Sequence, residues 1–213
     1  MCARASSRTL TKALSLRPWA LAFAGLWLAG CAARPTTPLP DITPWEARRA
    51  LLGGLGSWAF NGRVAVRTDA DGFNGKLRYR HTNDDFEAVL SGPLGIGTVR
   101  LVRENGTLIF TDKDGIVTEF TDPEVDLKFR FGWDVPLDSL RYWALGIPDP
   151  TRPADTTLNA DGQLESMAQG GWDIAVTRYD ETGGEVMPKR LTVTNEVTRV
   201  TLFIDRWDFS ESF

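Results

Sequence analysis

The stretch from Ser57 to Arg67 reads Ser-Trp-Ala-Phe-Asn-Gly-Arg-Val-Ala-Val-Arg. Its large apolar residues recur at every second position, and small or polar residues stand between most of them. Successive side chains of a β-strand point to opposite faces of a sheet, so this period of two predicts a strand with one apolar face. The stretch therefore indicates a fold built on half-buried β-strands.

Similar short segments follow and are separated by turns. We predict strands over residues 72–80, 86–91, 98–103, 107–111 and 116–121, and later over 163–169, 172–179, 190–195 and 200–207. Residues 81–84 read as a polar turn, and Asn105-Gly106 and Asp114-Gly115 are typical of two-residue hairpin turns. Short antiparallel strands at regular spacing favour a sheet that curls into a barrel or half-barrel.

Two segments interrupt the strand pattern with helical signals. Thr43, Pro44 and Glu46 provide an N-cap, a proline at the first helical position and a capping box, so a helix should begin there and run to about residue 52. Between Pro123 and Gly146 the apolar spacing predicts one or two short helices. We expect these helices to cover an opening of the sheet, which makes the fold mainly β with inserted short helices.

The first thirty residues have the layout of an export signal. They contain four basic residues and no acidic one, followed by an apolar run over residues 19–29 that is shorter than the roughly 20 residues needed to span a bilayer. The run ends in Leu28-Ala29-Gly30-Cys31, which resembles the lipobox of bacterial lipoproteins. We therefore expect cleavage before Cys31 and lipidation of its thiol, with two or more acyl chains holding the protein on a membrane.

Three regions follow from these signals. Residues 1–30 form the lipoprotein signal peptide, residues 31–43 the lipidated cysteine with a proline-containing flexible tether, and residues 44–213 a single domain. Cys31 is then the only thiol left, since Cys2 lies in the signal. Ala32 stands where an aspartate would favour retention at the inner membrane, so we expect a protein anchored in the outer membrane and facing the periplasm.

Charge and residue types argue against several functions. Removal of the four signal-peptide bases from 24 leaves 20 against 28 acidic residues, a net charge of about −8, and this balance without a basic cluster argues against nucleic-acid binding. His81 is the only histidine and is placed in the polar turn, and no serine has the flanks of a nucleophile elbow. We predict no catalytic residue, no metal site, no cofactor and no enzyme activity.

One loop between two predicted strands carries apolar residues. In the sequence from Leu90 to Thr98, Pro93 fixes one torsion and Gly95 permits a tight backbone. We expect Pro93, Leu94 and Gly95 to form a membrane-insertion loop with Leu94 projecting outward. A leucine entering an apolar phase contributes roughly 1.5 to 3 kcal/mol, enough to touch a bilayer but too little to anchor a protein in it. The alternative is that Leu94 packs over the end of the barrel.

Several motifs together resemble the LolB family of outer-membrane lipoprotein receptors. They are the lipobox at Cys31, the strand from Trp58, the loop at residues 92–95, the segments 136–148, 171–172 and 187–191, and the final Ile204-Asp205-Arg206-Trp207. The resemblance covers most of the chain after the signal. It implies an open antiparallel β-barrel, or half-barrel, with a helical lid over an apolar cavity.

The resemblance also implies a function and partners. The protein would act as a monomer that accepts acylated lipoproteins from the periplasmic carrier LolA and inserts them into the inner leaflet of the outer membrane, with Leu94 as the inserting residue. Our candidates for the cavity wall are the apolar strand and helix residues Trp58, Phe60, Val64, Phe86, Leu90, Leu101, Phe110, Trp143, Trp172 and Ile174. The alternative for each is ordinary β-core.

Two other functions remain open at this point. The chain could be a structural outer-membrane lipoprotein that binds another amphiphile or a partner protein, or a periplasmic hydrolase. A growth requirement, with lipoproteins accumulating in the periplasm on depletion, would favour the receptor.

Overall fold

A computed structural model describes residues 43–68, 72–93, 97–131 and 136–209. Cys31, Leu94 and Gly95 lie outside these ranges, as do the predicted signal peptide and nearly all of the tether. The described residues form one compact unit. Within the described ranges, no helix is long and apolar enough to cross a membrane.

In the part of the chain that the structure describes, eleven antiparallel strands form one sheet. The first half of the chain supplies β1 (Ser57–Thr68), β2 (Gly72–Thr82), β3 (Asp85–Ser91), β4 (Thr98–Glu104), β5 (Thr107–Thr111) and β6 (Val117–Phe120). The second half supplies β7 (Ala154–Leu158), β8 (Leu164–Gln169), β9 (Trp172–Thr182), β10 (Glu185–Thr194) and β11 (Thr198–Asp208). The prediction of an open antiparallel sheet is confirmed, and the sheet does not close on itself.

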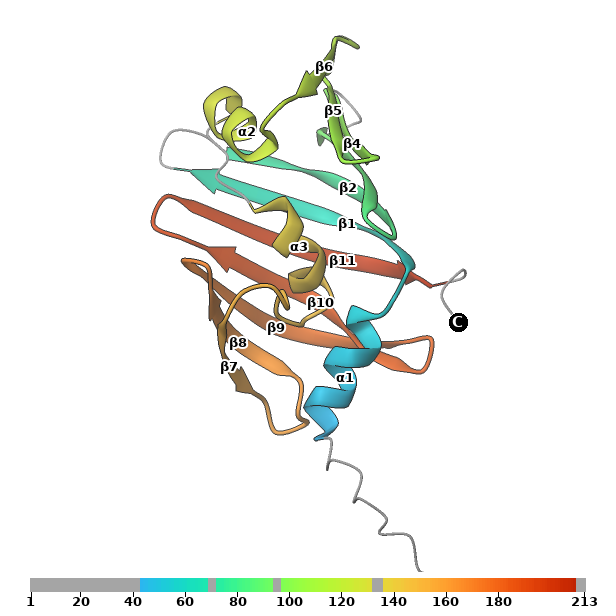
Figure 1. Cartoon of the computed structure of the whole chain (residues 1–213), viewed down its shortest axis with the longest axis vertical. Helices are drawn as coiled ribbons and strands as arrows, with labels where there is room; N and C mark the ends of the chain where they lie inside the picture. Colours follow the sequence, from blue (N-terminus) through green and yellow to red (C-terminus); the bar gives the residue numbers. More distant parts are fainter. Residues whose placement is uncertain (1–42, 69–71, 94–96, 132–135, 210–213) are drawn as a thin grey trace, which may run out of the picture. The chain divides into compact units, whose positions relative to one another are not determined.

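The order of the strands explains where the helices lie. The order is β6-β5-β4-β3-β2-β1-β11-β10-β9-β8-β7, so β1 and β11 pair at the centre while β6 and β7 form opposite edges. The chain between β6 and β7 must therefore cross the whole sheet, and it does so through α2 (Pro123–Phe131) and α3 (Leu137–Ala144). Figure 1 shows these helices over one face of the sheet. We call α2 and α3 the lid.

Helix α1 (Pro44–Gly53) begins as the sequence predicts. The Thr43 hydroxyl accepts a hydrogen bond from the Glu46 backbone N–H, and the Glu46 carboxylate accepts one from the Thr43 N–H, which completes the capping box. The helix packs near the β9–β10 hairpin, where the Arg48 guanidinium donates to the Val186 carbonyl oxygen at 2.5 Å. The prediction for this helix is confirmed within one residue.

One face of β1 is buried, as the alternation in its sequence predicts. The buried residues on the side of the sheet that faces the lid are Trp58, Phe60, Val64 and Val66. Arg63 and the other odd-numbered residues of β1 face the opposite side. Gly62 stands on the buried face beside a β-bulge in the pairing with β11, where an added Cβ would lie 2.3 Å from the Phe203 carbonyl oxygen. A glycine is therefore required for the close approach of the two central strands.

Several local predictions are corrected by the structure. His81 lies inside β2 and is buried, and the turn before β3 consists only of Asn83 and Asp84. The Asp114-Gly115 pair belongs to a longer loop over residues 112–116.

Strand β7 was not predicted, because an edge strand that is mostly exposed has no apolar alternation. Strand β10 starts at Glu185, before Pro188, and its pairing with β9 is irregular at that proline.

Candidate functional site

An apolar cavity of about 150 Å³ lies between the sheet and the lid. Strands β1 to β4, β10 and β11 form its floor, and α2 and α3 form its roof. Apart from Tyr79, every lining side chain is a hydrocarbon: Phe60, Val64, Val66, Leu77, Phe86, Ala88, Leu90, Leu101, Leu127, Leu137, Leu140, Ala144, Leu191, Val193, Val200 and Leu202. No charged side chain is among them, so the cavity suits an apolar ligand.

Strand register assembles the floor from distant parts of the chain. Val64 of β1 lies opposite Leu202 of β11, and Leu202 lies opposite Leu191 of β10. On the other side, Ala88 of β3 lies opposite Leu101 of β4. Directly opposite residues share a face of the sheet, so pairing alone brings these side chains to the lid side. The floor thus joins residues more than a hundred positions apart in the sequence.

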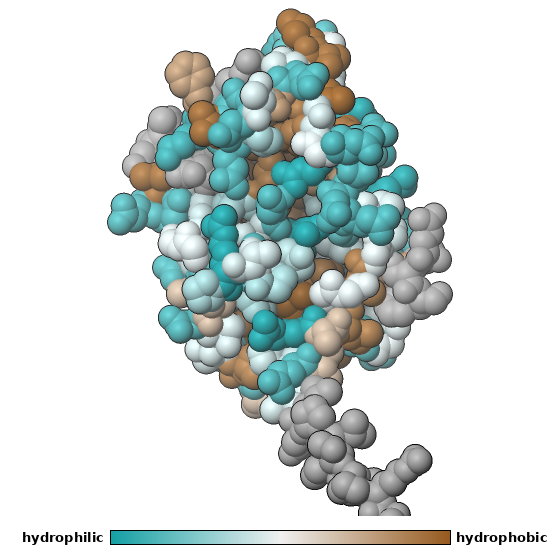
Figure 2. All heavy atoms as spheres, in the orientation of Figure 1, coloured by the Kyte–Doolittle hydropathy of each residue, from teal (hydrophilic) through white to brown (hydrophobic). Residues whose placement is uncertain are grey.

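The roof comes from one apolar face of each lid helix. Leu137, Leu140 and Ala144 of α3 are spaced by three and four residues, which places them on the same side of the helix. Leu127 of α2 is buried over the floor. On the outer side of α2, Phe129 is 90% exposed, and Val125 is also exposed. Figure 2 shows apolar surface at this end of the molecule, around α2 and the β5–β6 loop.

Tyr79 is the one lining residue with a polar group. Its ring packs against Trp58, Phe60 and Phe86, with centroid distances of 5.1, 5.4 and 5.8 Å. Burial raises the pKa of Tyr79 well above its ordinary value, outweighing the opposite effect of Arg141 and Arg103. The phenol therefore stays neutral, and the cavity carries no ionised group at physiological pH.

The C-terminal end of α3 is held by the buried side chain of Gln169 on β8. Its Oε1 accepts hydrogen bonds from the Trp143 indole N–H at 2.8 Å and from the Asp149 backbone N–H at 2.9 Å. Its Nε2 donates to the carbonyl oxygens of Asp149 and Arg152, both at 2.9 Å. All four interactions are internal, so this amide fixes α3 and the following loop to the sheet.

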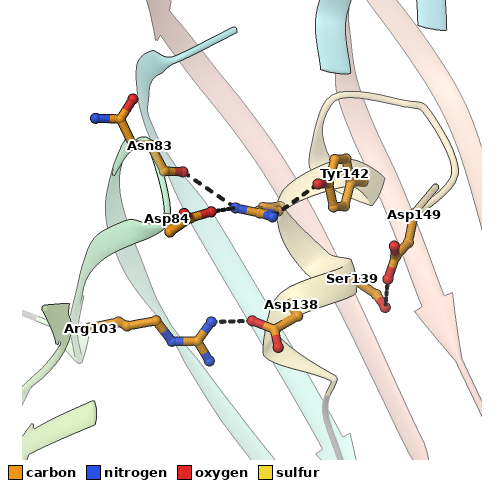
Figure 3. Close-up of polar contacts among 8 residues, drawn as sticks. Asn83, Asp84, Arg103, Asp138, Ser139, Tyr142 and Asp149 are labelled. Carbon is orange, nitrogen blue, oxygen red and sulfur yellow. Dashed lines mark hydrogen bonds and ion pairs between the residues drawn. The ribbon is translucent and has the colours of Figure 1, made fainter. Parts of the chain in front are cut away.

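Asp149 adds a second tie to α3. The Ser139 hydroxyl donates to its carboxylate at 2.7 Å (Figure 3), and Thr151 donates through its N–H at 2.9 Å and its hydroxyl at 2.8 Å. Burial acts to raise the pKa of Asp149, but these hydrogen bonds together outweigh it and lower the pKa below its ordinary value. The carboxylate is therefore a stable acceptor beneath α3.

The outward side of α3 is held by weaker, more exposed contacts. Arg103 of β4 forms an ion pair with Asp138 in the first turn of α3 (Figure 3). Arg141 donates to the Asn83 carbonyl oxygen at 3.3 Å, lies 3.5 Å from the Asp84 carboxylate, and donates to the Tyr142 hydroxyl at 2.9 Å. The contacts of α3 with Arg103, Asn83 and Asp84 join it to the rim formed by the β2–β3 turn and β4, and the bond to Tyr142 lies within α3.

The cavity includes half of the predicted wall residues. Phe60, Val64, Phe86, Leu90 and Leu101 line it. The other five are buried elsewhere in the core: Trp58 beside Trp207, Phe110 stacked on Phe120, Trp143 and Trp172 near each other, and Ile174 on β9.

The main omissions are on the lid and on β10 and β11. Leu137 and Leu140 could have been inferred from the helical spacing, and Leu191 and Leu202 from strand alternation. In the loop after β3, Gly92 is buried and Pro93 is exposed, whereas Leu94 and Gly95 lie outside the described residues. The roles of Cys31 and of this loop therefore stay predictions. Among described residues, no cluster of three or more His, Cys, Asp or Glu could hold a metal ion.

The fold and the cavity define a class of protein, in which an open β-sheet and the helices over it enclose an apolar cavity. A LolA superfamily protein from Nitrosomonas europaea has the same fold, with a TM-score of 0.52 over 77% of this chain and 90% of that chain at 8% identity. A DUF1329 family protein from Desulfovibrio piger aligns with a TM-score of 0.50 over 79% and 92% at 6% identity. These likenesses show the fold alone.

Sequence comparison identifies the family. The family model for the outer membrane lipoprotein LolB matches residues 56–207. Outer-membrane lipoprotein LolB of Pseudomonas putida is 33% identical over 184 residues, covering 84% of this chain and 90% of the relative, and that of Pseudomonas aeruginosa is 31% identical over 198 residues, covering 91% and 97%. The chain belongs to the LolB family of outer-membrane lipoproteins, as predicted from its motifs.

Proposed function

We propose that this protein receives acylated lipoproteins from a soluble LolA-type carrier, holds their acyl chains in the cavity under α2 and α3, and inserts them into the inner leaflet of the outer membrane. The supporting observation is the cavity itself, whose lining offers hydrocarbon and a single neutral phenol. Such a lining can stabilise an acyl chain and has nothing with which to bind a charged or strongly polar ligand.

Transfer energetics favour direct handover between the two proteins. Burial of an acyl chain of about 16 carbons contributes on the order of 10 kcal/mol at roughly 0.8 kcal/mol per CH₂. Release of that chain into water would be prohibitively slow, so cargo should pass from one cavity to the other without exposure. A receptor that binds about 1.4 kcal/mol more tightly than the carrier shifts the equilibrium tenfold toward itself.

Cargo entry requires the lid to move. The cavity of about 150 Å³ is smaller than the roughly 300 to 1,000 Å³ typical of sites for small ligands. The partly exposed contacts that Arg103 and Arg141 make between α3 and the rim are the weakest ties of α3, since ion pairs open to solvent contribute about 1 kcal/mol or less. We infer that α3 separates from the rim while Gln169 keeps its C-terminal end in place.

Lipidation and the loop after β3 complete the proposal. Residues 1–30 direct export, Cys31 carries the lipid, residues 31–43 act as a tether, and residues 44–213 form the receptor domain. The anchor keeps the receptor within reach of its target leaflet, and Leu94 contacts lipid during delivery. Leu94→Glu should therefore retain cargo acceptance and lose delivery to liposomes, because a carboxylate does not enter hydrocarbon. Unchanged delivery would contradict the role of the loop.

A pair of adjacent substitutions tests the cavity. Ala88 lies on the floor and Val89 faces the other side of β3, so Ala88→Phe should fill the cavity whereas Val89→Phe should leave it open. Using the chain without residues 1–31, we expect Ala88→Phe to accept a labelled lipoprotein from a loaded carrier at least about tenfold less well, with a cooperative unfolding transition retained. Equal losses in both variants, or in neither, would contradict the proposal.

A further inference from the structure

The face of the sheet opposite the lid carries a concentration of basic side chains. Nine exposed residues from five neighbouring strands project from it: Arg63, Arg67, Lys76, Arg78, Arg80, Arg178, Arg190, Arg199 and Arg206. We call this set the basic face. The helices of the described chain pack on the other side (Figure 1), so none of them covers it.

The basic face is unexpected from composition, since the whole chain has 28 acidic and 24 basic residues. The sequence shows no basic cluster, and the basic face is formed only when the strands pair. Because side chains of a strand alternate between the two faces, basic residues of one face are separated in the sequence by residues of the other face. Pairing of β1 with β11 then brings the strands from the two halves of the chain side by side. Within the described ranges, only Arg63 of the nine has a carboxylate within 4.0 Å, that of Asp205 at 2.8 Å.

Cross-strand pairing places like charges directly opposite one another on this face. Arg63 pairs with Lys76, Arg67 with Arg199, and Arg178 with Arg190. Directly opposed like charges destabilise a sheet. Asp205 already neutralises Arg63 of the first pair. The Arg67–Arg199 and Arg178–Arg190 pairs are therefore explained most simply if an external anion neutralises them.

A hollow of about 280 Å³ lies among these side chains, around Phe203. The guanidinium carbons of Arg190 and Arg63 lie 4.9 and 5.4 Å from the Phe203 ring centroid, and Arg178 and Lys189 also line the hollow. Arg63 donates to Asp205, which also lines the hollow, whereas the Arg190 guanidinium keeps its hydrogen-bond donors at the surface, where they can contact phosphate oxygens.

We propose that the basic face binds the phosphate headgroups of anionic phospholipid in the membrane that holds the protein. Five adjacent strands spread the charges over an extended surface, which can contact many headgroups at once. Lys76 lies opposite Ser91 at the end of β3, so the basic face reaches the strand that leads into the loop at residues 92–97. The proposal rests on the membrane location of the family and not on acyl-chain transfer.

Vesicle sedimentation tests the proposal with the non-lipidated chain, residues 32–213. We expect binding to vesicles of phosphatidylcholine plus phosphatidylglycerol that exceeds binding to phosphatidylcholine alone and decreases with salt. Arg67→Gln with Arg199→Gln should weaken binding to the anionic vesicles by roughly tenfold or more, while the urea midpoint stays equal or rises, because a repulsive pair is removed.

The matched control removes the same charge elsewhere. Arg49→Gln with Lys113→Gln changes exposed bases on α1 and the β5–β6 loop. These substitutions should leave vesicle binding within about twofold of the original protein.

Equal binding to both vesicle types, or equal weakening by both double variants, would overturn the proposal. Absence of vesicle binding together with weaker carrier binding by the Arg67 and Arg199 variant would assign the face to an acidic protein surface instead. Cargo acceptance should be unchanged in all of these variants, so failure here is distinguishable from failure of the proposed function.

Discussion

Gln169 shows how a single buried side chain positions the lid. Its amide satisfies the Trp143 indole, both backbone groups of Asp149 and the Arg152 carbonyl. We expect Gln169→Ala to lower the free energy of unfolding by about 3 kcal/mol, because several buried polar groups lose their partners together. Urea denaturation measures this value. Glu165→Ala, an exposed position on the same strand, should stay within about 0.5 kcal/mol, and an equally small effect for Gln169→Ala would show that the amide does not hold α3.

His81 makes the stability of the fold depend on pH. Burial, assisted by Arg141, lowers its pKa from 6.5 to about 4, although Asp84 and Asp85 oppose the shift. The folded protein therefore binds this proton more weakly than the unfolded chain. Stability should be complete above about pH 6.5 and should fall as the pH decreases toward about 4, by about 3 kcal/mol in total for this group.

The comparison that isolates His81 is with His81→Phe. Other groups titrate in the same range, so the relevant quantity is the difference in unfolding free energy between the two proteins, measured from about pH 7 to about pH 4.5. The original protein should lose more stability than the variant over this interval. Parallel pH profiles would show that the buried imidazole is not responsible.

At the scale of elements, we expect the contacts of α3 with the rim to determine access to the cavity. Asp138→Asn removes the ion pair with Arg103 and keeps the size of the side chain. We expect the variant to take up a fluorescent fatty acid faster, with less than about 1 kcal/mol lost in unfolding free energy, since the pair is partly exposed. Stopped-flow fluorescence measures the uptake rate. Asp180→Asn, which removes the ion pair with Lys189 on β9 and β10, should leave the rate unchanged; acceleration by both or by neither variant would argue against a specific contact.

The elements also show what sequence reasoning can reach. The alternation of β1 and the capping box of α1 are local signals, and both elements are found where predicted. Strand β7 is not predicted, because its side chains are mostly exposed and show no apolar alternation. His81 is predicted in a turn, because the polar residues after it extend the predicted turn two residues too far toward β2. Alternation also tells which side chains face inward without telling which of them lie under the lid. Hence Phe60 and Leu101 line the cavity, while Trp58 and Phe110 belong to the surrounding core.

On the scale of the whole molecule, composition conceals an asymmetry of the two sheet faces. One face is apolar and covered by helices, and the other collects basic side chains from strands that are distant in sequence. Net charge is a sum over the chain and cannot reveal such a separation. The asymmetry suits a receptor that holds acyl chains on one side and faces charged headgroups with the other.

The location of the acyl chain is the central claim, and it can be measured directly. A lipoprotein with a photoreactive diazirine in its acyl chain would be passed from a loaded carrier to the receptor and illuminated, and the modified residues identified by mass spectrometry. The account predicts labels on the floor and roof of the cavity, at residues such as Leu101, Leu140 and Leu191. Labels confined to the opposite face, for example at Val89 and Phe203, would contradict it.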